Sequence, residues 1–155
     1  MKITLKILAS VLVLTILFSA CKPNDPDPIS IEDQQLEKLT ASWKLSTPTS
    51  ATLDGTAQKG YDNFVLTISG TAGATSFGYT AAGRPSNSPW PPSGTWVFGA
   101  NPESQIVRDT GADKLDMTYS VSGTELQVTF NFSGVGYPSS RVSNVKGQWV
   151  FTFKK

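Results

Sequence analysis

Two stretches near the C-terminal end of the chain alternate between apolar and polar residues. The apolar positions are Leu126, Val128, Phe130 and Phe132 in residues 125–133, and Trp149, Phe151 and Phe153 in residues 147–154. Successive side chains of a β-strand point to opposite faces, so a period of two predicts strands with one buried and one solvated face. This pattern is typical of antiparallel sheets and excludes the two-sided apolar strands of a parallel α/β protein.

Similar short runs recur along the chain and predict about eight strands. Clusters of Gly, Pro, Asn, Asp and Ser separate these runs and favour turns. The expected strands are residues 42–47, 63–69, 76–80, 94–98, 105–109, 115–122, 125–133 and 147–154. Between two of these strands, Gly123 can adopt the positive φ angle of a tight hairpin.

A short helix is expected before the first strand. Ser30 can cap its N-terminus, and Glu32 and Asp33 lie in the first turn, where the helix dipole favours anions. Leu36 and Leu39 would form its buried edge.

The residues after this helix resemble the start of a lipocalin-like domain. Such domains begin the first strand with Gly-x-Trp, and Ala41-Ser42-Trp43 stands at that place here, with alanine instead of glycine. The segment Gln148 to Phe153 resembles the closing strand of bacterial lipocalin-like lipoproteins, and Arg141 loosely matches the arginine near that strand. The Thr-Asp-Tyr motif of classical lipocalins is absent.

This resemblance implies an all-β fold, an antiparallel up-and-down barrel of about eight strands with a short N-terminal helix. Trp43 would then close one end of the barrel. Residues 30–155 are expected to form this single β domain. A β-sandwich is the alternative, because the spacing of the strands fits both architectures.

The N-terminal segment resembles the signal peptide of a bacterial lipoprotein. Lys2 and Lys6 flank the start of an apolar run, and Ser19 and Ala20 lead directly to Cys21. The resemblance implies that residues 1–20 are removed and that a diacylglyceryl chain is attached to Cys21. A transmembrane or core helix is the alternative, but the run is shorter than the roughly 20 apolar residues that span a bilayer.

Residues 21–29 read as a lipidated cysteine followed by a tether rich in Pro and Asp, a composition that favours an extended, solvated backbone. Gram-negative lipoproteins retained in the inner membrane tend to carry Asp directly after the cysteine, and this chain has Lys22 there. The resemblance therefore implies an outer-membrane lipoprotein of a Gram-negative bacterium, either periplasmic or exposed at the surface.

Composition excludes several classes of function. The chain has no histidine and one cysteine, so Ser-His-Asp hydrolysis, Cys-His catalysis, a disulfide and histidine-built zinc sites are excluded. Removal of residues 1–20 would leave eleven basic and twelve acidic residues, without a concentrated basic face for nucleic acid. We therefore expect no enzyme, no cofactor and no nucleic-acid partner.

One loop contains three aspartates, Asp109, Asp113 and Asp116. Oxygen ligands of this kind could bind calcium, but the spacing differs from an EF-hand loop and Lys114 adds a positive charge. We expect a polar hairpin loop without a metal.

The longest connection, residues 83–94, carries the candidate binding residues. Prolines surround Trp90 and lower the entropy cost of presenting it, and Arg84 lies in the same loop. We expect Trp90 and Arg84 to contact a ligand or partner, with Tyr79 of the preceding strand as a neighbour. The alternative is that Trp90 folds back and covers the end of the β structure.

Two functional hypotheses follow. The first is a non-catalytic binding module for a small apolar molecule or a glycan. The second is an accessory or structural lipoprotein that docks on a larger outer-membrane protein complex. The inner face carries enough bulky aromatic residues to fill a small barrel, which favours binding at the rim or outer surface.

Overall fold

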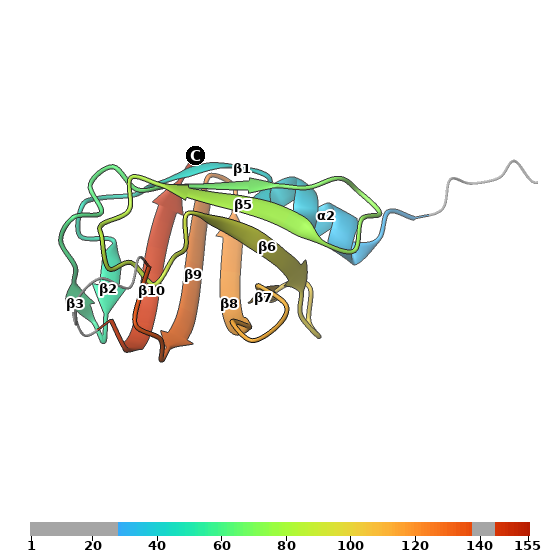
Figure 1. Cartoon of the computed structure of the whole chain (residues 1–155). Helices are drawn as coiled ribbons and strands as arrows, with labels where there is room; N and C mark the ends of the chain where they lie inside the picture. The colour runs from blue at the N-terminus through green and yellow to red at the C-terminus, as the bar shows by residue number, and fades with distance from the viewer. Residues whose placement is uncertain (1–27, 138–144) are drawn as a thin grey trace, which may run out of the picture.

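The computed structural model describes residues 28–137 and 145–155 (Figure 1). The signal peptide, Cys21, most of the tether and Arg141 lie outside the described residues. Within the described ranges, no helix combines the length and the apolar character needed to cross a membrane.

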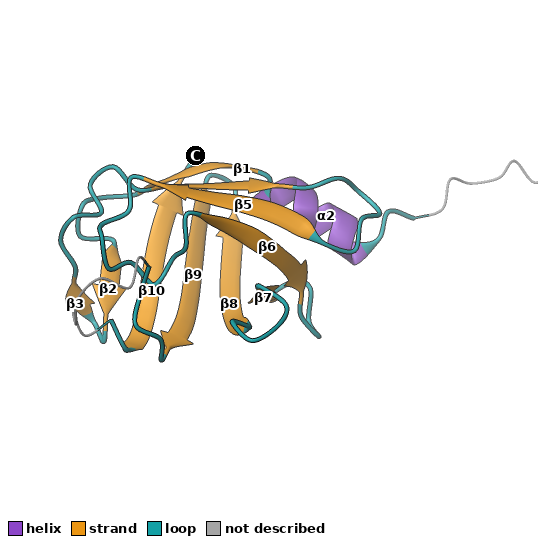
Figure 2. Cartoon of the chain, viewed as in Figure 1, coloured by secondary structure: helices purple, strands orange, loops and turns teal. Residues whose placement is uncertain are grey.

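The expected helix is α2, Ile31–Leu39. The Ser30 side chain caps it by accepting a hydrogen bond from the Asp33 backbone N–H at 3.0 Å. Leu36 and Leu39 are buried, as the sequence predicts. The helix closes one end of the β structure (Figure 2).

Ten strands make up the β structure of the described residues. They are β1 (Ala41–Leu45), β2 (Ala51–Leu53), β3 (Thr56–Ala57), β4 (Val65–Ser69), β5 (Phe77–Ala82), β6 (Ser93–Phe98), β7 (Gln105–Arg108), β8 (Leu115–Ser122), β9 (Glu125–Phe132) and β10 (Gly147–Lys154). Every pairing between them is antiparallel.

The sheet closes into an eight-stranded antiparallel barrel, which confirms the barrel and rules out the sandwich. From β4 to β10 each long strand pairs with the next, and β1 pairs with both β4 and β10. The closing register places Lys44 opposite Lys154 and Leu45 opposite Phe153. The tight hairpin at Gly123 is also confirmed, with a φ of 57°.

The β2–β3 hairpin was not predicted. β10 pairs first with β1 and then with β2, so these two segments run in the same direction along one neighbour. Between them residues 46–50 loop out opposite Thr152, which bonds Ser46 and Ser50 through its backbone. Pro48 lies in this loop and has no N–H to donate to a ladder, so the predicted strand 42–47 ends early at Leu45.

The inner face of the barrel is packed with aromatic side chains. Trp149, Phe151 and Phe153 stack along β10, and each ring plane is tilted by 11° from that of the next ring. Trp43 is fully buried beside α2, and its Nε1 donates to the Leu39 carbonyl oxygen at 2.8 Å. The predicted buried faces of β9 and β10 are therefore correct.

Candidate functional site

The end of the barrel opposite α2, here called the mouth, holds the candidate residues. The connection between β5 and β6, residues 83–92 and here called the mouth loop, turns inward at this end. Trp90 is only 2% exposed, and Tyr79 packs edge-on against it with 5.7 Å between ring centroids. The structure thus brings Trp90 and Tyr79 together, but in the core, as in the alternative that Trp90 folds back.

Arg84 does not share this contact. Its Nη1 donates to the backbone oxygen of Tyr137, in the connection after β9. The guanidinium that lies over the Trp90 ring belongs to Arg108, 5.4 Å from the ring centroid. An exposed recognition surface made of Trp90, Arg84 and Tyr79 is therefore not present in this structure.

Arg108 is the centre of a buried polar cluster. It is 1% exposed, and its Nε lies 3.1 Å from Oδ2 of Asp109. The Tyr79 hydroxyl donates to the same oxygen at 3.2 Å, and the Thr95 N–H donates to Oδ1 at 3.2 Å. Burial raises the pKa of Tyr79 well above its usual value. The Asp109 carboxylate thus balances the buried charge of Arg108. It also accepts hydrogen bonds from the Tyr79 hydroxyl and the Thr95 N–H.

Hydrogen bonds hold the mouth loop in place. Arg108 Nη1 donates to the Pro89 carbonyl oxygen at 2.8 Å. Ser88 forms an isolated antiparallel bridge with Tyr137, and its buried hydroxyl accepts hydrogen bonds from the Trp90 N–H and the Tyr61 hydroxyl. Burial raises the pKa of Tyr61 to about 12. The loop is therefore bonded to β7 and to the segment after β9.

Neither Arg108 nor the role of Asp109 was predicted from the sequence. Arg108 follows the buried Ile106 by two residues, so the period of two places it on the inner face of β7. That position is the signal that would have identified it, because an arginine on a buried face needs a charged or polar partner. The adjacent Asp109 supplies one by adopting a positive φ of 51°.

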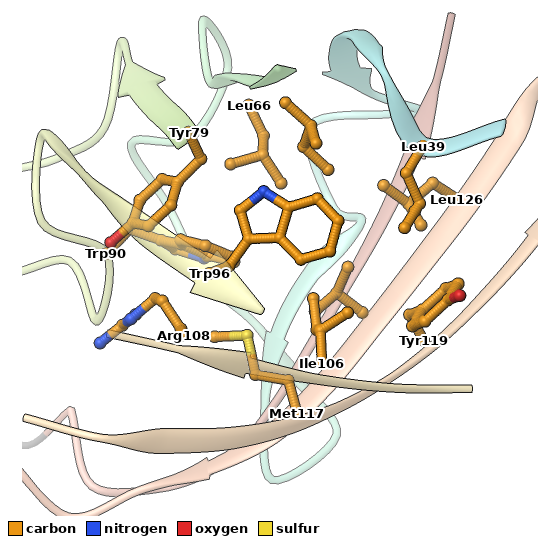
Figure 3. Close-up of a pocket in the computed structure, with 12 residues that line it drawn as sticks. Leu39, Leu66, Tyr79, Trp90, Trp96, Ile106, Arg108, Met117, Tyr119 and Leu126 are labelled. Carbon is orange, nitrogen blue, oxygen red and sulfur yellow. The ribbon is translucent and has the colours of Figure 1, made fainter. Parts of the chain in front are cut away.

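A small cavity of about 20 Å³ lies in the barrel interior that the described residues form. It lies between Leu39 of the helix end and Trp90 of the mouth, with Trp96 and Met117 also lining it (Figure 3). A volume of this size is close to that of a single water molecule. The expectation that aromatic side chains fill the barrel is consistent with this packing.

A larger hollow lies at the mouth, here called the rim groove, formed by residues 112–115 and 132–137 with a volume of about 540 Å³. Leu115 and Tyr137 are half-buried in it, and Phe132 is buried beneath. Val135 is 67% exposed, whereas most large apolar residues in the described ranges are covered. Asp113 and Lys114 add charge at one side.

The aspartate loop lies beside this groove. Lys114 pairs with Asp116 at 3.2 Å, and both side chains are exposed. Asp109 instead turns toward Arg108 and Tyr79. Among the described residues, no three acidic or metal-binding side chains gather into a metal site.

Comparison with protein-family models, curated proteins and solved structures found no match to this chain.

Proposed function

We propose that this protein is a non-catalytic binding module, anchored in the outer membrane through a lipid on Cys21, which binds its ligand in the rim groove. The groove carries the proposal because it combines a volume of about 540 Å³ with the exposed apolar side chain of Val135, whereas the interior cavity measures about 20 Å³. Small-molecule sites commonly occupy about 300–1,000 Å³. The lipobox and Lys22 support the location.

The lining of the groove favours a small apolar molecule with a polar group at one end. Leu115, Phe132 and Val135 offer apolar contacts, and Lys114 can pair with an acceptor or anion. The Tyr137 ring also suits one face of a sugar, so a short glycan is the second ligand class.

The fluorescent apolar dye N-phenyl-1-naphthylamine tests the groove. Val135→Asp places a carboxylate among its apolar side chains and should weaken dye binding at least about tenfold, because burying an unpaired charge is costly. Ile31→Asp is the matched control, since Ile31 is 53% exposed and lies on α2, away from the groove. Equal dye affinity for both variants and wild type would show that the groove is not the site.

The exposed Val135 also supports the alternative, an accessory subunit docked on an outer-membrane complex. Such a subunit would bind neither the dye nor immobilised glycans. It would co-purify with a stoichiometric outer-membrane partner, and Val135→Asp would break that complex while Ile31→Asp would not.

A further inference from the structure

Trp90 occupies a cage of aromatic rings although it belongs to a loop. Phe130 and Phe151 meet its indole edge-on, with ring planes at 90° and 79°. Tyr79 meets it at 75°, and the Arg108 guanidinium lies over the ring. The barrel wall therefore surrounds one planar bicyclic ring, the indole of Trp90, and this ring comes from a connecting loop and not from a strand.

The hydrogen bonding of Trp90 differs from that of the other tryptophans. Trp43 and Trp149 donate from Nε1 to backbone oxygens at 2.8 Å, and Trp96 does so at 3.2 Å. The Nε1 of Trp90 is buried and has no hydrogen-bond partner among the described residues. A buried donor without a partner is disfavoured relative to the same group in water. Withdrawal of Trp90 would return this donor to solvent.

The exchange requires the mouth loop to leave its hydrogen bonds to Arg108 and Tyr137. The mouth loop contains no regular strand, and Pro89, Pro91 and Pro92 restrict its conformations to a few. The cavity of about 20 Å³ adjoins the indole, so the vacated space would be continuous with it. The other walls of this space are the rings of Phe64, Tyr79, Phe130 and Phe151 and the guanidinium of Arg108.

We propose that Trp90 is an exchangeable occupant and that its cage is a second ligand site, which takes a neutral planar aromatic molecule of about indole size when the mouth loop withdraws. The edge-on rings select a flat aromatic group. The fixed positive charge of Arg108 disfavours cationic rings and offers N–H donors to an acceptor on the ligand. This site has different walls from the rim groove, although the mouth loop also bonds Tyr137 of that groove.

Indole is the test ligand, titrated into the ¹⁵N-labelled protein. The chain has four tryptophans, and Trp90→Phe identifies the Nε1–H signal of Trp90 by its loss. In the wild type, indole should shift this signal and accelerate its exchange with water, while the Trp43 signal stays unchanged. Trp90→Ala should bind indole at least about tenfold more tightly than the wild type, because no internal competitor has to leave.

A Trp90 signal that stays unchanged up to the solubility limit of indole, while Trp90→Ala binds indole, would overturn the proposal and leave Trp90 as a fixed core residue. Should Trp90→Ala not fold, the wild-type titration up to the solubility of indole decides by itself. Val135→Asp separates the two sites. It should leave the indole titration unchanged. Loss of indole binding in this variant, while its Trp90 signal keeps the wild-type position and water exchange in the absence of indole, would place indole in the rim groove and overturn the cage proposal.

Discussion

The guanidinium of Arg108 lies over the indole of Trp90, with 5.4 Å between Cζ and the ring centroid. The same side chain donates to the carbonyl oxygen of Pro89, the residue before Trp90. One buried residue of β7 therefore contacts both the ring and the backbone of the mouth loop. Asp109 completes this connection by pairing with Arg108 at 3.1 Å.

Replacement of Arg108 by Gln should lower the free energy of unfolding by about 2–3 kcal/mol, because it removes the cation that pairs with Asp109 and the donor to the Pro89 carbonyl oxygen. The Asp109 side chain is 23% exposed, so water screens part of the loss. Urea denaturation measures the effect. Lys114→Gln breaks the exposed pair with Asp116 and should cost less than about 1 kcal/mol. Equal losses would contradict the structural role of Arg108.

Trp43→Ala and Trp90→Ala should both destabilise the fold by about 3–5 kcal/mol, because both side chains are buried. An exposed Trp90 would instead show a much smaller loss than Trp43. The phenylalanine variants separate the two sites further, since Trp43→Phe removes the hydrogen bond to Leu39 and Trp90→Phe removes none. Thermal and urea melts should show a loss about 1 kcal/mol larger for Trp43→Phe.

Buried tyrosines should make the fold sensitive to alkali. Burial raises the pKa of Tyr61 and Tyr119 to about 12, compared with about 10 in an unfolded chain. The folded state holds these protons more tightly than the unfolded state. Their contribution to the free energy of unfolding is therefore complete below about pH 10 and is lost as the pH rises through about 12. Unfolding free energies measured from pH 9 to pH 12 should fall, and Tyr61→Phe should reduce the slope. A slope that Tyr61→Phe leaves unchanged would contradict this assignment.

Cys21→Ala should abolish membrane anchoring. The lipid provides the hydrophobic transfer energy, and the tether of Pro and Asp provides none. Wild-type protein should enter the detergent phase of a Triton X-114 extract, whereas the variant should not. Wild type in the aqueous phase with an uncleaved N-terminus would contradict the lipoprotein assignment.

Local patterns in the sequence were enough to predict most of the strands. Alternation identified the inner faces of β9 and β10, and Ser30 identified the start of α2. The β2–β3 hairpin could not be predicted, because β1 and β2 pair with the same strand, β10, on either side of a loop. A pairing of this kind depends on residues about 100 positions away and has no local period.

The sequence by itself determined the strand pattern, the capped helix and the absence of histidine chemistry, because these depend on neighbouring residues or on composition. Tertiary structure alone decided that the strands close into a barrel and that Trp90 points inward. A proline-flanked tryptophan is stabilised by burial against any apolar surface, whether that surface belongs to the core or to a ligand. Only the position of Phe130, Phe151 and Arg108 around the mouth shows which surface covers it.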